Sequence, residues 1–425
     1  MVKPLNKKKI AIIGLGYVGL PLAIEFAKYY SVFGYDINKD RVCQLLNGLD
    51  KTNEADIGLM ESLLYSTLML SSDEKVIADC NIFIITVPTP IDSFKVPDLS
   101  LLINATKVVA TYLKPGNLVI YESTVFPGCT EERCVPVLEL YSGLKFNIDF
   151  FVGYSPERVS PGDKQKSLCN TIKVTSGSCP EAALIVDDLY KSIIKVGTYL
   201  APSIKVAEAS KAIENAQRDI NISFINEVAL ILDKMDIETN EVLSAARTKF
   251  NFLDFRPGLV GGHCISVDPY YLAYKATEVG YNPHVILSGR YVNDFMPKFV
   301  ANKVVKLMSK KGLFSSTAKV LILGFTFKEN CPDTRNTKVF DIIIELNSFG
   351  LHVDIYDPLA DKEEVKASFA LDLIDELDFA SYNAIIIAVG HDIFKRINFE
   401  EISRKNVVLF DTKSLVDESY SDSRL

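Results

Sequence analysis

Apolar residues in the first 160 positions gather into five short runs, a pattern typical of buried strands in a parallel sheet. The runs occupy residues 9–13, 31–35, 81–87, 118–121 and 151–154. Between the first two runs, Leu20, Ala23, Ile24 and Ala27 recur at helical spacing. Strand, helix and strand in this order predict a doubly wound α/β domain in the amino-terminal third.

The middle of the chain changes to a helical pattern. Residues 202–235 form one long helical stretch, for which Ser203 is the expected N-cap. At ~1.5 Å per residue this helix would span ~50 Å, which is typical of a helix that links domains or forms a dimer seam. Further helices are expected at 241–249, 270–280 and 285–308.

The last third returns to an α/β pattern. Apolar runs recur at 319–324, 353–357, 384–390 and 407–411, and the second of them ends on an acidic residue. This part repeats the organisation of the first third. A nucleotide could bind here through Lys328 and the backbone near it; the alternative is a domain with a purely structural role.

Composition limits the class of protein. The chain has 425 residues, of which 48% are hydrophobic and 24% charged, and this predicts a globular protein of two or three domains. The net charge of −8 argues against a nucleic-acid surface. The apolar stretch 10–27 is interrupted by glycines, a proline and a glutamate, so we expect neither a targeting segment nor membrane insertion.

The positions of the cysteines and histidines indicate the redox state of the thiols and whether a metal is bound. Eight cysteines are scattered over the chain without a CxxC pair, and the four histidines are isolated. We therefore expect reduced thiols in a cytoplasm, and no metal site.

A glycine motif follows the first predicted strand. Gly14, Gly16 and Gly19 form GxGxxG at the start of a predicted helix, and Asp36 ends the second strand. Such glycines let the backbone approach a pyrophosphate at the helix N-terminus. A carboxylate at Asp36 would bind the ribose hydroxyls and repel a 2′-phosphate, which favours NAD over NADP. A glycine turn without a ligand is the alternative.

Small polar residues follow two later strands. Pro88 and Thr89 stop the run at 81–87, and Ser123 and Thr124 follow the run at 118–121. A doubly wound sheet binds its ligand at these carboxyl ends. The segment 155–162 places an acid and a base, Glu157 and Arg158, between Pro and Gly residues, and indicates either a rigid functional loop or a solvated turn.

Two positions of the middle region could carry chemistry. Lys211 and Asn215 are four residues apart and share one face of the long helix, where they could orient a carbonyl or an oxyanion. Cys264 follows Gly261 and Gly262, which let a substrate approach closely, and a helix beginning near Pro269 would favour its thiolate. The alternatives are a solvated lysine and a buried structural thiol.

Taken in order, seven motifs resemble those of the UDP-sugar 6-dehydrogenases over nearly the full length of the chain. They are GLGYVG at 14–19, VPTP at 87–90, EST at 122–124, SPER at 155–158, the Lys211/Asn215 pair, GGHC at 261–264 and GFTFK at 324–328. His263 and the sequence at 329–333 look most like the branch that acts on UDP-N-acetylhexosamines. Within it, the chain is most similar to UDP-N-acetylglucosamine/galactosamine 6-dehydrogenases of capsule, Vi-type and O-antigen synthesis; enzymes for UDP-N-acetylmannosamine or UDP-glucose are the alternative.

The resemblance implies a fold and a reaction. The fold is two Rossmann-like doubly wound domains joined by a central all-helical domain with one long helix. Its parts would be an NAD-binding domain at 1–200, a helical domain at 201–308 that forms a homodimer, and a UDP-binding domain at 309–425. The reaction is two successive oxidations at C6, from alcohol to acid, with two NAD+ consumed.

Residue roles follow from the resemblance as well. Cys264 would attack the C6 aldehyde to form a thiohemiacetal, which is oxidised to a thioester and hydrolysed. The other catalytic candidates are Lys211 and Asn215 on the C6 oxygen, Glu157 and Thr124 on water and protons, and Asp268 near the sulfur. The NAD candidates are Gly14, Gly16, Tyr17, Val18, Gly19, Asp36, Arg41, Pro88, Thr89, Ser123, Thr124 and Arg335. The substrate candidates are Glu157, Arg158, Lys211, Asn215, Arg256, Gly261, Phe327 and Lys328, with Arg256 a candidate to reach across a dimer interface.

Two other classes of protein compete with this interpretation. A catalytically silent NAD-binding regulator would lack Cys264, Lys211 or Glu157, and all three are present. A hydroxyacid dehydrogenase would transfer a single hydride and would need no thiol. Release of two NADH per substrate, rather than one, separates the two kinds of enzyme.

Overall fold

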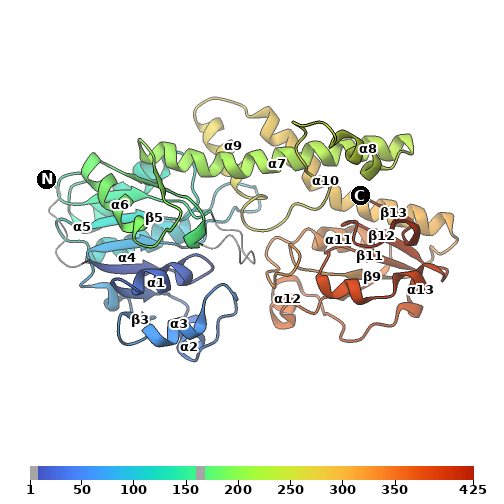
Figure 1. Ribbon diagram of the computed structural model, residues 1–425, viewed down its shortest axis with the longest axis horizontal. Helices are drawn as coiled ribbons and strands as arrows, with labels where there is room; N and C mark the ends of the chain where they lie inside the picture. The colour runs from blue at the N-terminus through green and yellow to red at the C-terminus, as the bar shows by residue number, and fades with distance from the viewer. Residues whose placement is uncertain (1–7, 159–167) are drawn as a thin grey trace. The chain divides into compact units, whose positions relative to one another are not determined.

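A computed structural model describes residues 8–158 and 168–425. The chain divides into two compact units, one made of residues 1–214 and 270–282, the other of residues 215–269 and 283–425 (Figure 1). The expected functional loop at 155–162 is therefore described only as far as Arg158, and its remainder lies outside the described residues.

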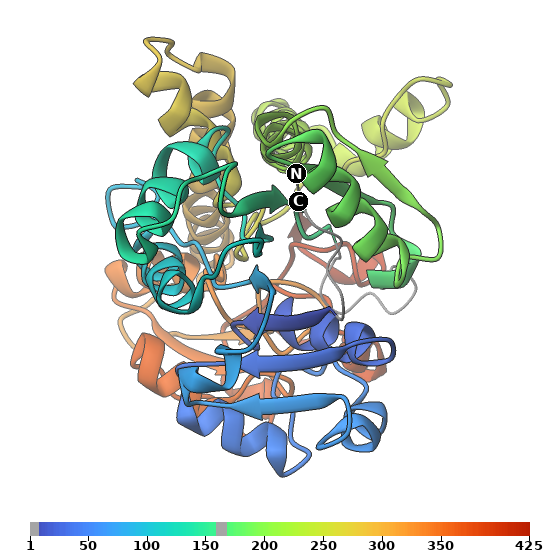
Figure 2. The same cartoon turned by 90° about the vertical axis from the view of Figure 1, so that its left-hand side faces the viewer.

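The first unit is built on a single sheet whose strands run side by side in Figure 2. In the described residues its order is β3-β2-β1-β4-β5-β6-β7-β8, and the first six positions have the strand order of a Rossmann fold. β7 pairs antiparallel with β6, and the other pairs are parallel. The strands are β1 (Lys9–Ile13), β2 (Ser31–Tyr35), β3 (Leu68–Ser71), β4 (Ile82–Ile85), β5 (Leu118–Tyr121), β6 (Phe151–Tyr154), β7 (Lys173–Gly177) and β8 (Thr198–Leu200).

Helices cover this sheet and complete its core. Ile10 and Ile12 of β1 are fully buried and belong to one apolar cluster with Leu20 and Ala23 of α1. Burial on both faces explains why the strands are apolar throughout rather than alternating. The helices are α1 (Gly19–Ala27), α2 (Lys39–Leu46), α3 (Ile57–Leu63), α4 (Ser100–Tyr112), α5 (Val135–Ser142) and α6 (Pro180–Lys191), with a π-helical turn at Thr130–Cys134.

The middle of the chain is helical, as expected. α7 (Ile204–Met235) is 32 residues long, and Ser203 caps it by accepting a hydrogen bond from the Val206 N–H. α8 (Thr239–Ala246) begins and ends earlier than the predicted 241–249. α9 (Asp268–Glu278) begins just after the cysteine loop, and α10 (His284–Lys310) follows it.

The second unit contains the other sheet, with all its described strands parallel in the order β10-β9-β11-β12-β13. Val320 and Ile322 of β9 face one apolar cluster, and Leu321 and Leu323 face another, so both sides of the sheet are covered. The strands are β9 (Lys319–Leu323), β10 (His352–Tyr356), β11 (Ala384–Ile387), β12 (Val408–Asp411) and β13 (Ser423–Arg424). The helices are α11 (Val339–Ser348), α12 (Lys362–Phe369) and α13 (Phe399–Ser403).

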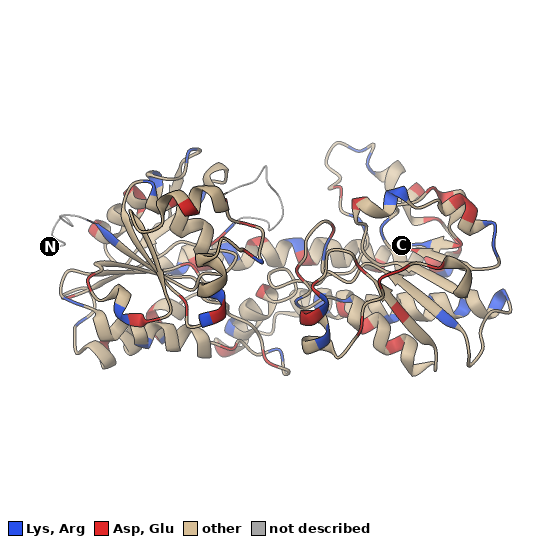
Figure 3. Ribbon diagram, turned by 90° about the horizontal axis from the view of Figure 1, so that it is seen from below, with Lys and Arg blue, Asp and Glu red and all other residues tan. Residues whose placement is uncertain are grey.

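The predicted fold class is confirmed: two doubly wound α/β domains flank a helical region with one long helix. Acidic and basic side chains are interspersed over the elements of both units (Figure 3). Among the described residues, none of the helices carries an apolar stretch long enough to traverse a bilayer.

Candidate active site

The glycine loop joins β1 to α1 in the first unit. Gly14 has φ +96°, a left-handed conformation that side chains avoid. A Cβ on Gly19 would lie 1.8 Å from the Gly14 carbonyl oxygen, so this glycine allows the helix and strand to pack closely. A Cβ on Gly16 would meet nothing within 4 Å. Tyr17 and Val18 are half-buried between them.

Asp36 lies at the tip of β2, against this loop. Its Oδ2 accepts a hydrogen bond from the Leu15 N–H (2.8 Å) and its Oδ1 accepts one from Asn38 N–H. Arg41 approaches the loop from α2, since its Nε donates to the Leu15 carbonyl (2.9 Å) and its Nη2 lies 2.7 Å from Asp50. Although burial opposes the charged form of Asp50, hydrogen bonds from Thr52 and Arg41 lower its pKa.

This loop fits the pyrophosphate of a dinucleotide. Open space at Gly16 leaves room for a ligand against the backbone, and the first turn of α1 contains no acidic residue to repel an anion. Asp36 stands where the ribose hydroxyls of such a ligand are bound in folds of this type.

The tips of β4 and β5 are tied to one another. The Thr89 hydroxyl donates to the Thr124 carbonyl (2.7 Å), and the Ser123 hydroxyl donates to the Val87 carbonyl (2.6 Å). Pro88 is exposed beside them. The predicted residues of both strand ends are therefore brought together at the carboxyl edge of the sheet.

A buried ion cluster lies behind the end of β6. Glu157 is half-buried, and its Oε2 lies 3.6 Å from Nζ of Lys173. The same ammonium donates to Glu122 across 2.7 Å. Burial raises the pKa of Glu122, while Lys173 opposes the shift. Arg158 forms an ion pair with Glu214 (2.9 Å).

Lys211 lies in α7 and is buried, which excludes the solvated lysine that the sequence left open. One turn earlier, the carboxylate of Glu208 is fully buried and accepts hydrogen bonds from the Gly128 and Thr130 N–H groups. Burial raises the pKa of Glu208 to about 7, although both N–H donors favour the carboxylate. Glu208 fastens this part of α7 to the turn that follows β5.

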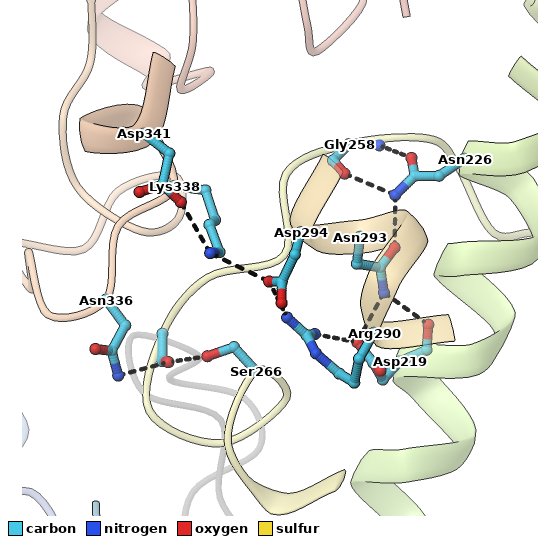
Figure 4. A network of polar contacts seen from close by, with 11 residues as sticks. Asp219, Asn226, Gly258, Ser266, Arg290, Asn293, Asp294, Asn336, Lys338 and Asp341 are labelled. Carbon is cyan, nitrogen blue, oxygen red and sulfur yellow. Dashed lines mark hydrogen bonds and ion pairs between the residues drawn. The ribbon is translucent and has the colours of Figure 1, made fainter. Parts of the chain in front are cut away.

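The cysteine loop belongs to the second unit, where Cys264 is half-buried rather than enclosed. The N–H groups of Val267 and Asp268 donate to the Cys264 carbonyl (3.0 and 2.8 Å), which closes a turn at the start of α9. Ser266 and Asn336 both donate to the carbonyl oxygen of Gly262 (Figure 4).

Both glycines of this loop are required by close contacts. Gly262 has φ +83°, and a Cβ there would lie 2.8 Å from the Phe327 ring. A Cβ on Gly261 would lie 2.7 Å from the Asn336 carbonyl oxygen. The loop is therefore packed against the segment that follows β9, which contains Phe327 and Lys328.

A buried polar network fixes the chain just before the loop (Figure 4). The Asn226 side chain donates to the Gly258 carbonyl (3.0 Å) and accepts from the Gly258 N–H (2.8 Å). Asn226 also donates to Asn293, which donates to Asp219, and Asp219 pairs with Arg290 at 2.6 Å. The same guanidinium reaches Asp294, to which Lys338 is bound.

Two further contacts involve residues before and after Cys264 in the chain. Asn215 of α7 donates to Asp268 across 2.5 Å. His263 lies 3.4 Å from Asp333, and Asp333 accepts three hydrogen bonds from the Arg335 guanidinium. Burial opposes the charge of Asp333, but hydrogen bonds and charge from Arg335 lower its pKa.

The loop after β9 repeats the geometry of the glycine loop after β1. The Gly324 N–H donates to the Tyr356 carbonyl, just as the Gly14 N–H donates to Tyr35. Asp357 accepts from the Phe325 N–H, just as Asp36 accepts from Leu15. The second sheet thus presents a nucleotide-type loop, with Lys328 on it.

A cavity of about 270 Å³ opens in the second unit. Exposed Arg256, together with Glu329 and Lys413, lines it. Glu329 and Lys413 form an ion pair at 2.8 Å.

Sequence reasoning missed Lys173, Tyr190, Glu208 and Asp333. In the described residues, no group of three His, Cys, Asp or Glu side chains is placed to bind a metal ion.

Three family models match this chain in order. They are the NAD-binding, central and UDP-binding domains of the UDP-glucose/GDP-mannose dehydrogenase family, at residues 8–194, 205–295 and 321–418. The chain belongs to this family. It is therefore an NAD-dependent oxidoreductase of UDP sugars that carries an NAD-binding and a UDP-binding domain.

Relatives of this dehydrogenase match it over nearly the whole chain. It is 51% identical to UDP-N-acetyl-D-glucosamine 6-dehydrogenase of Salmonella typhi, over 99% of each chain, and 51% identical to the Pseudomonas aeruginosa protein of the same name, over 98% and 99%. Among solved structures, UDP-D-ManNAc dehydrogenase from Pyrococcus horikoshii has a TM-score of 0.88 and 33% identity, over 98% of each chain.

Proposed function

We propose that this dehydrogenase oxidises C6 of a UDP-N-acetylhexosamine, either UDP-N-acetylglucosamine or UDP-N-acetylgalactosamine, to the uronic acid. The observation that carries the proposal is the 51% identity, over the full chain, to an enzyme named for UDP-N-acetyl-D-glucosamine. Identity to the UDP-D-ManNAc dehydrogenase is lower, at 33%. The second candidate is therefore the same reaction on UDP-N-acetylmannosamine, and the third is oxidation of UDP-glucose.

Cys264 is the proposed nucleophile. When bound, NAD+ supplies the hydride acceptor for each of the two oxidations, and the net change is alcohol plus water to carboxylate. The thiolate adds to the C6 aldehyde and forms a thiohemiacetal, so the aldehyde cannot escape between the two oxidations. Oxidation of the thiohemiacetal gives a thioester, which water cleaves to release the acid and the thiol. Cys264 lies just before the N-terminus of α9, a position that favours a thiolate over a thiol.

The remaining catalytic roles are assigned to polar residues of α7 and the neighbouring loops. Lys211 and Asn215 are proposed to stabilise the C6 oxygen, since both lie one turn apart in α7. Glu157 and Thr124 would accept protons and position water. Asp268, held by Asn215, would assist proton transfer near the sulfur.

Ligand binding is assigned to two sets of residues. Arg335 and the first-unit residues of the NAD set, which are the glycine loop, Asp36, Arg41 and the strand tips, would hold NAD. Arg158, Arg256, Gly261, Phe327 and Lys328 would hold the UDP-sugar. The cavity lined by Arg256 and the nucleotide-type loop bearing Lys328 support this second assignment.

We also propose a homodimer through the helical region. Phe224 and Ile231 of α7 are seven residues apart, so they share one helical face, and both are more than half exposed. Leu287, Tyr291 and Phe295 form an exposed stripe on α10, four residues apart. Apolar stripes of this kind are typical of protein interfaces. The domain boundaries of 1–200, 201–308 and 309–425 remain part of the proposal; β8 ends at Leu200 and β9 begins at Lys319.

The proposed setting is the cytoplasm, where the product would serve as a precursor for surface polysaccharide. The eight cysteines are not paired with one another in the described residues, and unpaired thiols are typical of proteins in reducing compartments.

The test is an assay of NADH release with a panel of UDP-sugars. We expect turnover of UDP-N-acetylglucosamine or UDP-N-acetylgalactosamine with two NADH per sugar, and much slower turnover of UDP-glucose. A preference for UDP-N-acetylmannosamine or UDP-glucose would overturn the sugar assignment. Release of only one NADH would overturn the two-step oxidation.

A further inference from the structure

Lys173 is a buried cation that the proposed chemistry has not used. It is the first residue of β7, and its side chain is 2% exposed. Its ammonium lies 2.7 Å from Glu122 and 3.6 Å from Glu157, two carboxylates from different strand ends. A buried charge requires such partners, because removal from water is costly.

The side of Lys173 away from Glu157 is fully packed. Glu122 has no exposed side-chain surface and accepts a second hydrogen bond from the Tyr190 hydroxyl. The Lys173 ammonium also lies over the Tyr190 ring, 5.2 Å from its centroid. Glu122 and Tyr190 therefore fix the position of the ammonium.

Glu157 in turn is held at both carboxylate oxygens. Its Oε2 faces Lys173, and its Oε1 accepts a hydrogen bond from the Arg158 N–H (2.7 Å). Arg158 is anchored by the carbonyl of Ile172, the residue before Lys173, across 2.8 Å. Lys173, together with Arg158, which is held by the neighbour of Lys173, thus sets the orientation of Glu157.

We propose that Lys173 is a positioning residue, which holds the Glu157 carboxylate in the orientation that its proton-transfer role requires. The inference rests on the proposed function, because it needs Glu157 to act on water or on the C6 hydroxyl. Among the described residues of this unit, the charged and titratable groups near Glu157 include Lys173, Glu122 and Tyr190, together with Arg158 and its partner Glu214.

The competing explanation is that Lys173 only neutralises Glu122. Lys173→Met alone cannot decide between the two, because it would leave a buried carboxylate without its cation and could unfold the protein. The informative variants are the double substitutions K173M/E122Q and K173Q/E122Q, which remove both charges together. K173Q/E122Q keeps two hydrogen-bonding amides in the same space, and it replaces K173M/E122Q in the test if that variant does not fold.

The matched control is Glu122→Gln, which removes the carboxylate and leaves Lys173 beside Glu157. We expect each folded double variant to lose at least tenfold more kcat than this control, with KM for NAD+ and for the UDP-sugar changed less than about threefold.

A folded double variant that matches Glu122→Gln in kcat would overturn the role of Lys173. Glu157→Gln, measured in parallel, separates that failure from a failure of the proposed function. If Glu157→Gln is impaired and the double variant is not, only the inference about Lys173 is wrong. If Glu157→Gln turns over normally, the role proposed for Glu157 is itself wrong.

Discussion

Asn215 donates a hydrogen bond from its Nδ2 to Oδ2 of Asp268 across 2.5 Å. Asp268 is buried and begins α9, and its own N–H donates to the Cys264 carbonyl. The bond therefore links the long helix to the turn that carries the cysteine. Sequence reasoning selected both residues for separate roles, and the structure makes them hydrogen-bonding partners.

Asn215→Asp should make activity depend more steeply on pH. Two carboxylates at this separation cannot both ionise without strong repulsion, so one of them would keep a proton to a higher pH than usual. In that state the O–H donates to the other carboxylate and replaces the amide. The kcat of the variant relative to wild type should therefore rise as the pH falls from about 8 to about 6. Asn215→Ala is the control, and its kcat relative to wild type should not change with pH. A kcat ratio for Asn215→Asp that is equally independent of pH would contradict the expectation.

Asp36 has two tasks that a pair of variants can separate. Its carboxylate accepts from the Leu15 N–H, and its charge would repel a 2′-phosphate. Asp36→Asn keeps an acceptor for Leu15 and loses the charge, so it should mainly improve binding of NADP+ relative to NAD+. Asp36→Ala also releases the glycine loop and should weaken NAD+ binding by a further ~1–2 kcal/mol, roughly five- to thirtyfold in Kd. Equal Kd values for NAD+ in wild type and Asp36→Ala would rule out the first task, and an unchanged preference for NAD+ over NADP+ in Asp36→Asn would rule out the second.

Much of this architecture could be predicted because the strands are continuous apolar runs. β1, β2, β5 and β6 have the predicted bounds. β7 was missed because its sequence, Lys-Val-Thr-Ser-Gly, is mostly polar. The hydroxyl groups of β7 are buried and hydrogen-bonded. The Ser176 hydroxyl, for example, donates to the Tyr154 carbonyl. A pattern of hydrophobic positions does not reveal a polar strand whose partners are elsewhere.

The missed site residues have the same explanation. Lys173 lies 51 residues from Glu122, and Glu208 lies 80 residues from Gly128. Neither spacing follows a helical or strand period, so only the folded chain brings the partners together. No feature of the sequence singled out Lys173, because its burial is established only by the folded chain.

Glu208 should make stability fall as the pH rises. Burial raises its pKa to about 7, above the ordinary value of a glutamic acid. Between about pH 4.5 and pH 7 the folded state keeps a proton that the unfolded state releases, so raising the pH through this window favours unfolding. Glu208→Gln cannot titrate. Its free energy of unfolding relative to wild type should therefore increase by up to about 3 kcal/mol across the window and then stay constant.

Denaturation curves at several pH values measure this difference. Glu227→Gln, at an exposed glutamate of the same helix, is the matched control and should follow wild type. If the free energies of unfolding of wild type and Glu208→Gln change in the same way from pH 5 to about 8, Glu208 does not cause the pH dependence of stability.

Cys264→Ser tests the covalent stage. A serine hydroxyl has a pKa far above that of a thiol, so little alkoxide forms at neutral pH. The variant should bind NAD+ and UDP-sugar almost normally, and its steady-state rate should fall by at least a thousandfold. Mass spectrometry after incubation with substrate and NAD+ would detect any trapped covalent or aldehyde-level species. Near-normal release of two NADH per sugar would return Cys264 to a structural role.

Gly262→Ala tests whether the cysteine loop must pack against Phe327. Gly262 and Gly280 both have φ +83°, so alanine costs ~1–2 kcal/mol of backbone strain at either position. A Cβ on Gly262 would in addition meet the Phe327 ring at 2.8 Å, whereas at Gly280 it would meet nothing within 4 Å. We therefore expect similar losses of thermal stability from backbone strain in the two variants, but a fall in kcat of tenfold or more only in Gly262→Ala, because the added methyl displaces the turn that holds Cys264. Equal kcat values in the two variants would mean that Phe327 does not set the position of the loop, and that the left-handed backbone alone requires this glycine.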